Sequence, residues 1–407
     1  MSRYLFFPFP LYSHMLPTLA VMEELLAHGE EVTCFLPEHF RQIIEATGAR
    51  FRAYHFDLVE QEELQAIGPA DGDKSIALFL SRMFRKSPEV IPPLLESIRE
   101  EQGDCIVAEC MFLWPRIAAR ILHLPTIGLC PTYAIPGAES GDRTHEQFKA
   151  KLYQQFKKQA TEHSPLEDGL ALLSRTYGLS IPELRSLQGT AEPLTIVFQP
   201  RAFRPDGDTF DERFLFVGPS FQRKRYSSTS FPLEQLNQHP LVYISLGTNF
   251  NNQLDFYRQC FLAFSGTEWQ VVLSYGTRLD PALLPPSPSN FLLAPQVPQL
   301  EVLPRADVFI SHGGMNSVME SLYYGVPLVV IPQTRQEEAA HRVRELELGI
   351  VLDKETLTAD RLREATTRAA HDPDIHARAS TMRQAIQEAG GPKRAAEAII
   401  QFTNGSH

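Results

Sequence analysis

The strongest constraint on the fold is an alternation of short apolar runs with amphipathic helical patterns. The pattern predicts a buried strand over Tyr4–Phe9, a helix over Leu16–His28 that ends at Gly29, and a second strand over Glu31–Leu36. Strands joined through a helix pair in parallel, so this unit predicts a parallel sheet covered by helices. The chain has 407 residues, more than one ordinary core takes, and we expect two such α/β domains.

Further strands are predicted in both halves, at 50–56, 105–109, 126–130 and 194–198, and then at 241–246, 270–273, 291–294, 308–311 and 328–331. Between them, residues 203–230 are rich in Arg, Asp, Pro, Gly and Ser, with a short apolar run at 214–217. This predicts an N-terminal domain over 1–205, a linker over 206–232 and a C-terminal domain over 233–385, followed by a helical segment over 386–407. Ligands of doubly wound sheets bind beyond the carboxyl ends of the strands, so we expect the active site between the domains.

Charge and hydropathy exclude several classes of protein. The formal net charge is −11, which gives no general attraction to a phosphate backbone, so we expect no nucleic-acid partner. The apolar start contains Pro8 and Pro10 and lacks a small-residue cleavage site, so it predicts a strand and not a signal peptide. No run of about 18 apolar residues occurs. The cysteines form no C-x-x-C pair and indicate free thiols. We therefore expect a cytoplasmic protein without stable membrane insertion.

The most informative local motif follows the predicted strand at 308–311. Two glycines and a helix beginning near Asn316 come after it, and free N–H groups at a helix start bind anions. A histidine can donate a further hydrogen bond to a phosphate, Asn and Ser are good helix caps, and a glutamate one turn later can accept from ribose hydroxyls. The candidate residues are His312, Gly313, Gly314, Asn316, Ser317 and Glu320. An ordinary strand–loop–helix turn would explain the glycines alone, but the whole segment favours a phosphate site.

Other nucleotide and metal motifs are missing or poorly placed. The sequence has no G-x-G-x-x-G and no Walker lysine motif, which argues against a dinucleotide oxidoreductase or an NTPase. Asp-x-Asp patterns occur at 71–73, 206–208 and 372–374, each beside Gly or Pro and none directly after a strand. We interpret them as turns and expect neither a metal ion nor another cofactor.

With these motifs in place, the chain resembles the macrolide-type UDP-glycosyltransferases, bacterial relatives of the plant and animal small-molecule glycosyltransferases. The resemblance covers most of the chain and is strongest at 12–37, 104–131, 241–248 and 295–349. It implies a GT-B fold, in which two Rossmann-like domains face each other across a cleft. The first domain would bind mainly the acceptor and the second mainly the nucleotide sugar. The C-terminal helix would return to the first domain.

The resemblance also implies a catalytic pair. The family has a Gly-His-x-x-Pro motif after its first strand, and the matching stretch here is Ser13-His14-Met15-Leu16-Pro17, which makes His14 the catalytic base. An aspartate from a later strand orients that histidine in the family. The matching acid here is Glu109, which is one methylene longer.

The donor residues follow from the same resemblance. Gln296 and Val297 would meet the uracil, and Glu320 the ribose. His312 and the N–H groups of Asn316 and Ser317 would hold the diphosphate, with a second contact from Gly247 and Thr248. Gln336 matches the glutamine that holds the sugar hydroxyls, in a stretch one residue short, but Arg335 stands where an acidic residue is usual. The sequence therefore leaves two features of the donor open: the sugar itself, and whether the nucleotide is UDP or TDP.

These observations together predict an inverting, metal-independent glycosyltransferase. It would move a hexose from a UDP- or TDP-sugar to a hydroxyl of a hydrophobic small molecule such as a macrolide, polyketide or phenolic. Two alternatives remain, a nucleotide-sugar epimerase and a nucleotide-sugar-binding homologue with weak catalysis. The sequence fixes neither the acceptor nor the oligomeric state.

Overall fold

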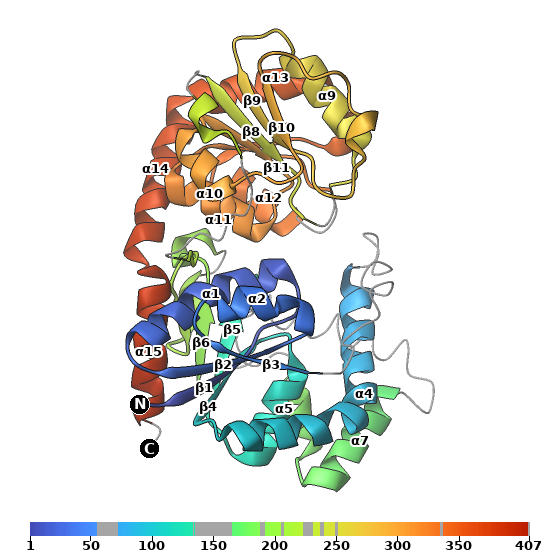
Figure 1. Ribbon diagram of the computed structural model, residues 1–407, viewed down its shortest axis with the longest axis vertical. Helices are drawn as coiled ribbons and strands as arrows, with labels where there is room; N and C mark the ends of the chain where they lie inside the picture. The colour runs from blue at the N-terminus through green and yellow to red at the C-terminus, as the bar shows by residue number, and fades with distance from the viewer. Residues whose placement is uncertain are drawn as a thin grey trace. The chain divides into compact units, whose positions relative to one another are not determined.

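A computed structural model describes residues 1–54, 72–132, 134, 165–187, 192–204, 207–222, 231–236, 240–248, 251–333 and 337–405. The chain divides into two units, each built around a parallel sheet (Figure 1). Unit 1 contains Met1–Pro200, Asp206–Arg223 and Ala389–His407. Unit 2 contains Arg201–Pro205 and Lys224–Glu388.

Unit 1 holds a seven-stranded sheet in the order β3-β2-β1-β4-β5-β6-β7, and every neighbouring pair is parallel. Its strands are β1 (Arg3–Phe7), β2 (Glu31–Leu36), β3 (Arg50–Ala53), β4 (Cys105–Glu109), β5 (Thr126–Cys130), β6 (Leu194–Val197) and β7 (Phe214–Phe216). Its helices are α1 (Tyr12–Ala27), α2 (Arg41–Glu45), α4 (Gly72–Glu101), α5 (Leu113–Leu122), α7 (Pro165–Tyr177), α8 (Ile181–Ser186) and α15 (Gly391–Gly405).

Side chains of β1 show how this sheet builds a core on each face. Successive strand residues point to opposite faces. Tyr4 and Phe6 enter a cluster with residues of α1 and α15, whereas Leu5 and Phe7 enter a cluster with residues of α4, α5 and α7. All four side chains are fully buried, which explains why the strand is a continuous apolar run. Figure 1 shows α15 running beside α1.

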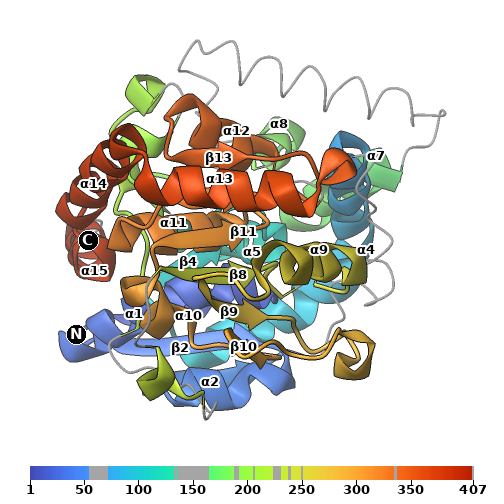
Figure 2. The same ribbon diagram turned by 90° about the horizontal axis from the view of Figure 1, so that it is seen from above.

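Unit 2 holds a six-stranded parallel sheet in the order β10-β9-β8-β11-β12-β13. The strand labels in Figure 2 follow this order from β10 to β13. The strands are β8 (Leu241–Ser245), β9 (Gln270–Ser274), β10 (Phe291–Ala294), β11 (Val308–Ser311), β12 (Leu328–Val330) and β13 (Gly349–Val351). The helices are α9 (Leu254–Phe264), α10 (Gln299–Val302), α11 (Met315–Tyr324), α12 (Glu337–Glu345), α13 (Ala359–His371) and α14 (Pro373–Glu388). Short 3-10 helices are η1 (Glu38–Phe40), η4 (Arg201–Phe203), η5 (Gly207–Thr209), η6 (Leu233–Gln235), η7 (Pro281–Leu283), η8 (Leu303–Arg305) and η9 (Lys354–Thr356).

The unit boundaries differ from the predicted linker over 206–232. The first part of that stretch belongs to unit 1, because β7 pairs with β6 at the edge of the sheet. Just before it, residues 201–205 belong to unit 2, where the Arg342 guanidinium donates to the carbonyls of Ala202, Phe203 and Arg204. Composition marked a change of domain here, but strand pairing and this arginine decide where each residue belongs.

Both sheets have the strand order of a dinucleotide-binding α/β fold, in which the first strand lies beside the fourth. The order reverses between β1 and β4 in unit 1, and between β8 and β11 in unit 2. Such reversal points are where ligands bind, beyond the carboxyl ends of the strands. The predicted α/β class and the return of the C-terminal helix to the first unit are confirmed.

Candidate active site

His14 and Glu109 come together at the reversal point of unit 1. Glu109 is the last residue of β4, and His14 lies in the first turn of α1, which follows β1. The Nδ1 atom of His14 lies 2.7 Å from Oε1 of Glu109. The backbone N–H of Phe9 donates to the other carboxylate oxygen of Glu109 at 3.1 Å. The longer glutamate side chain therefore reaches the imidazole.

This pair differs from its predicted setting in one respect. The sequence predicted a helix from Leu16, with His14 in the preceding loop, but α1 begins at Tyr12. The carbonyl of Leu11 accepts from the N–H groups of His14 and Met15, so the helix has already started at this point. His14 is thus held by helical backbone as well as by Glu109, which fixes the direction of its ring.

Glu109 sets the charge behaviour of His14. The His14 side chain is 15% exposed and that of Glu109 is 2% exposed. Burial alone would lower the pKa of His14, but the charge and the hydrogen bond of Glu109 outweigh it, so the pKa is raised above 6.5. A carboxylate only accepts, so Nδ1 of His14 carries the proton and Nε2 is the basic nitrogen. This is the arrangement of a general base with its orienting acid.

Apolar side chains surround the pair in sequence and in space. The Phe9 ring lies 5.6 Å from the His14 ring, and Phe112 packs edge-on against Phe9. Met111 and Tyr12 are large apolar side chains that remain exposed, at 37% and 49%. In the sequence, Met111 and Tyr12 stand two residues from Glu109 and His14.

In unit 2, His312 follows β11 and its ring lies between two glycines. A Cβ atom at Gly247 would lie 2.6 Å from the His312 ring, and one at Gly314 would lie 2.5 Å from it. Only glycine fits at either place. Gly247 and Gly313 also have positive φ angles, of 73° and 84°, which favour glycine. The loops after β8 and β11 therefore converge on the imidazole.

His312 is neutral and carries a buried nitrogen that needs a partner. Burial lowers its pKa to about 4, so the ring is uncharged near neutral pH. Among the described residues, nothing hydrogen-bonds its Nδ1. A buried polar atom without a partner is costly, and a ligand oxygen would satisfy it as an acceptor. This observation fits the predicted phosphate contact.

The start of α11 has the features of an anion site, but not through the predicted caps. The helix begins at Met315 with Gly314 as its N-cap, and no side chain caps it. Asn316 and Ser317 are therefore the second and third helical residues. Their backbone N–H groups are among those that a helix start leaves without intrahelical partners. Helix α11 follows β11 along the chain, and both are labelled in Figure 1.

Three residues that the sequence analysis missed shape the loops after β8 and β11. Ser245 and Ser311 are paired in register, and each hydroxyl accepts from the glycine N–H two residues later. Asn251, which is 2% exposed, donates to the carbonyls of Gly247 and Thr248 at 2.9 and 3.3 Å. The spacing of each serine before its glycine was visible in the sequence, whereas nothing there marked Asn251.

The two residues predicted to contact the nucleobase lie just after β10. Gln296 is exposed after β10, and Val297 packs against the core of unit 2. Three residues on, Gln299 begins α10 and donates to Glu320, and its Nε2 lies 3.5 Å from Oγ of Ser317. Gln299 therefore belongs with the ribose and phosphate candidates. A second Pro-Gln pair, at Pro298-Gln299, was the signal that could have found it.

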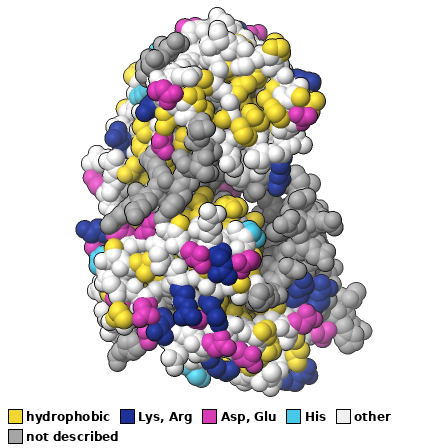
Figure 3. Space-filling model, in the orientation of Figure 1, with side chains coloured by type: hydrophobic (Ala, Val, Ile, Leu, Met, Phe, Trp, Pro, Cys, Tyr) yellow, Lys and Arg dark blue, Asp and Glu magenta, His cyan; other side chains and the backbone are white. Residues whose placement is uncertain are grey.

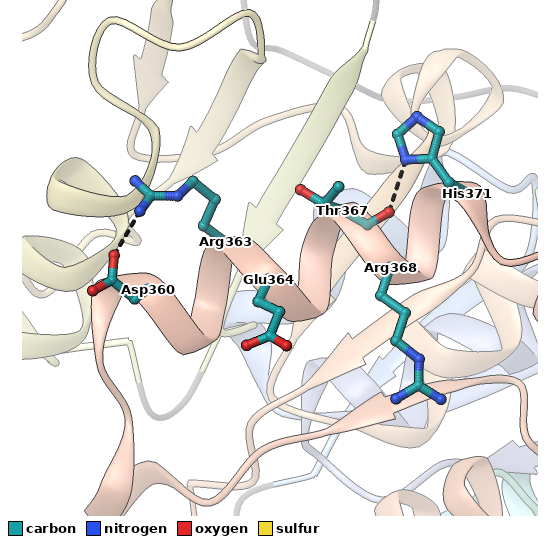
Figure 4. Close-up of a pocket in the computed structure, with 6 residues that line it drawn as sticks. All are labelled: Asp360, Arg363, Glu364, Thr367, Arg368 and His371. Atoms are coloured by element: carbon teal, nitrogen blue, oxygen red, sulfur yellow. Dashed lines mark hydrogen bonds and ion pairs between the residues drawn. The ribbon is translucent and has the colours of Figure 1, made fainter.

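The remaining residues and motifs from the sequence analysis do not add to these two sites. Gln336 and Arg335 fall outside the described residues. Asp372 of the last Asp-x-Asp pattern accepts from the N–H groups of Asp374 and Ile375, which is a helix cap. A depression on the surface of α13 contains none of the predicted site residues (Figure 4). It is lined by Asp360, Arg363, Glu364, Thr367, Arg368 and His371.

The drawn face of unit 1 carries side chains of both charges (Figure 3). On the face of unit 1 drawn in Figure 3, Lys and Arg side chains are interspersed with Asp and Glu side chains. Within the described residues, no helix combines the length and apolar character needed to cross a bilayer.

Known proteins are similar to this chain over both units. Residues 268–402 match the family model of the C-terminal domain of erythromycin biosynthesis protein CIII-like proteins. The NDP-glycosyltransferase YjiC of Bacillus licheniformis is 37% identical, over 97% of this chain and 96% of the relative. The demethyllactenocin mycarosyltransferase of Streptomyces fradiae is 31% identical, over 98% of this chain and 86% of the relative.

A solved structure gives the same result. The calicheamicin glycosyltransferase CalG4 superposes with a TM-score of 0.81 at 29% identity, covering 100% of this chain and 99% of that one. Full-length similarity of this kind confirms the predicted GT-B fold of two Rossmann-like domains. The chain belongs to the bacterial small-molecule glycosyltransferases of the macrolide and UDP-glycosyltransferase family.

Proposed function

We propose that this glycosyltransferase is inverting and independent of metal ions, and that it moves a hexose from a UDP- or TDP-sugar to a hydroxyl of a hydrophobic small molecule. The hydrogen-bonded pair of His14 and Glu109 at the reversal point of unit 1 carries the proposal. Relatives named NDP-glycosyltransferase and mycarosyltransferase support the class of donor and product.

His14 is the general base in this scheme. Its Nε2 takes the proton of the acceptor hydroxyl as the oxygen attacks the anomeric carbon of the donor. Glu109 accepts from Nδ1 and stabilises the imidazolium that forms. The bond from the anomeric carbon to the diphosphate breaks on the opposite side, so the configuration of the sugar inverts. The proton then leaves His14 for solvent.

The diphosphate keeps the electron pair of the broken bond, and negative charge builds on it as it leaves. The N–H groups at the start of α11 and the neutral His312 ring stabilise that charge by hydrogen bonding. Glycines at 247 and 314 let the ring lie close to the backbone of both loops. This arrangement supplies the stabilisation that a metal ion provides in other transferases.

Apolar side chains beside the base favour an apolar acceptor. Met111 and Tyr12 are exposed and stand two residues from Glu109 and His14 in the sequence, and apolar surface of this kind would bury a flat or branched hydrocarbon skeleton better than a sugar or a peptide. The relative that carries demethyllactenocin in its name points to the same class of acceptor.

The direct test is mass spectrometry of a matrix of UDP- and TDP-hexoses against macrolide and phenolic acceptors. We expect a hexose-sized mass gain on at least one acceptor, an inverted anomeric centre by NMR, and the same rate with EDTA. Retention of configuration or loss of activity with the chelator would refute the mechanism. Epimerised donor without any acceptor would instead identify an epimerase.

His14→Ala tests the base. Transfer should fall by about 10²–10⁴-fold, the usual contribution of general-base catalysis, while UDP affinity stays within about twofold. His28→Ala is the control, because His28 is an exposed histidine at the end of the same helix. Steady-state kinetics and calorimetry measure the two quantities, and undiminished transfer by His14→Ala would remove this residue from the mechanism.

A further inference from the structure

A directed chain of hydrogen bonds runs beneath the nucleotide site of unit 2. The Tyr243 hydroxyl donates to Oε1 of Gln299 at 3.1 Å, and Nε2 of Gln299 donates to Oε2 of Glu320. The chain joins β8 to the carboxylate on α11.

Chemistry fixes the direction of this chain at both ends. A carboxylate only accepts, so the atom of Gln299 that faces Glu320 must be its NH₂ group. The amide oxygen of Gln299 must then face Tyr243, whose hydroxyl acts as the donor. Burial raises the pKa of Tyr243, so that hydroxyl keeps its proton at any physiological pH.

Tyr243 is well placed to hold this geometry. It lies on β8, it is 1% exposed, and its ring stacks on that of Phe309 on β11 with centroids 4.8 Å apart and an interplanar angle of 9°. The ring therefore has one position, set by the two central strands. A donor in a fixed position prevents the Gln299 amide from rotating by half a turn, which would turn its oxygen toward Glu320 and repel the carboxylate.

We propose that Tyr243 is a positioning residue for recognition of the nucleotide ribose. Acting through Gln299, it holds the Glu320 carboxylate so that its remaining lone pairs accept from the ribose hydroxyls of the donor. This deepens the function proposed above and rests on it. Tyr243 does not touch the ligand, and its effect appears as selectivity between nucleotides that have and lack these hydroxyls.

Calorimetry with UDP and 2′,3′-dideoxyuridine diphosphate tests the idea, since only the sugar hydroxyls differ. Wild-type protein should bind UDP about tenfold more tightly or better, the effect of losing hydrogen bonds to a charged group. In Tyr243→Phe this ratio should fall to about twofold, while affinity for the dideoxy nucleotide changes by less than about twofold. The phenyl ring keeps the stacking on Phe309, so the variant removes only the hydroxyl.

A contrasting variant separates positioning from a general loosening of the unit. Tyr257→Phe also removes a buried hydroxyl, which donates to the carbonyl of Asn251 at 3.0 Å beside the phosphate loop. Tyr257→Phe should change the affinities for UDP and for the dideoxy nucleotide alike, so the ratio of the two affinities stays as in the wild type. If Tyr243→Phe does not fold, Gln299→Leu removes the same link from a surface helix and should give the same loss of selectivity.

The outcomes are distinct. A folded Tyr243→Phe or Gln299→Leu variant with the wild-type ratio would overturn the role of the chain. Equal wild-type affinity for both nucleotides would overturn it as well. Failure of wild-type protein to bind either nucleotide would instead count against the proposed function. A fall of the affinity ratio in Tyr243→Phe, with unchanged affinity for the dideoxy nucleotide, supports the positioning role.

Discussion

At the residue scale, the base chemistry proposed for unit 1 depends on one carboxylate, Glu109. Glu109→Gln keeps the shape of the side chain and removes its charge, so burial alone would set the pKa of His14 and lower it. A base works only above its pKa, so the acidic limb of the kcat/KM profile should move to lower pH. Transfer should also fall, by about 10²-fold or more, because the imidazolium loses its partner.

The measurement is a pH–rate profile of wild type, Glu109→Gln and Glu24→Gln. Glu24 is a buried carboxylate on the same helix, 5% exposed, and serves as the control. An acidic limb that stays at its wild-type pH in Glu109→Gln would show that another group titrates there.

A second residue-scale prediction concerns the glycines around His312. Gly247→Ala would place a Cβ atom 2.6 Å from the ring, so the imidazole must move and its hydrogen bond to a phosphate is lost. We expect UDP affinity to fall by about tenfold or more. Gly266→Ala is a matched control, because its φ of 67° gives similar backbone strain to the 73° of Gly247 but its Cβ would meet nothing within 4 Å.

Calorimetry of the two alanine variants with UDP decides between ring displacement and backbone strain. Equal losses of affinity in both would mean that strain accounts for the effect and that His312 does not contact the diphosphate. Comparable thermal unfolding of the two variants would show that their backbone costs match.

At the element scale, the sequence predicted most strands but placed the helix starts less well. Fully buried parallel strands such as β4 and β11 are continuous apolar runs, and glycines or polar residues end them, so periodicity finds them. The start of α1 was missed because Pro17 is typical of a first helical turn, whereas here it lies inside the helix. The short strand β13 was missed because it has three residues, and all three are only partly buried.

The site was predictable as far as single motifs go and no further. His14, Glu109 and His312 each follow or end a strand, which local patterns show. Asn251 and Tyr243 act through contacts between segments far apart in the chain, with Gly247 in one case and Gln299 in the other. Such contacts depend on strand order, which a single sequence does not state.

An ion network at the ends of α5 and β6 gives the prediction at this scale. Buried Arg116 donates to Glu192 at 2.6 Å and to the carbonyls of Cys110 and Leu187 at 2.8 and 2.7 Å. The Glu192 side chain is 0% exposed, and within the part of the chain that the structure describes Arg120 is its remaining ion-pair partner if Arg116 is removed. Arg116→Met should lower the free energy of unfolding by about 3 kcal/mol, the cost of breaking a buried pair.

Chemical denaturation measures this cost, with Arg120→Met as the comparison. Arg120 is 29% exposed and shares the same glutamate, so its loss should cost about 1 kcal/mol. Similar costs for the two variants would mean that the network does not depend on burial of Arg116.

At the scale of the whole molecule, the ends of the chain meet in one unit. The chain leaves unit 1, builds unit 2 and returns at Ala389, where the N–H of Gly391 donates to the carbonyl of Val217 at 2.8 Å. Helix α15 then packs against α1, which carries His14, the proposed base, near its start. The stability of the base site therefore depends on residues at the far end of the sequence.

Ile399→Lys tests this dependence. Ile399 is 0% exposed in the core that α1 and α15 share, so a charge there should cost about 3 kcal/mol or more and lower the Tm of unit 1 by roughly 6–12 °C. Glu397→Lys puts the same side chain at an exposed position of the same helix, and it should change neither the free energy of unfolding nor the Tm. Because the candidate phosphate residues lie in unit 2, UDP affinity should stay within about twofold in Ile399→Lys while transfer falls as unit 1 unfolds. Scanning calorimetry with and without UDP follows both effects, and a parallel loss of UDP binding would show that the two units do not fold independently.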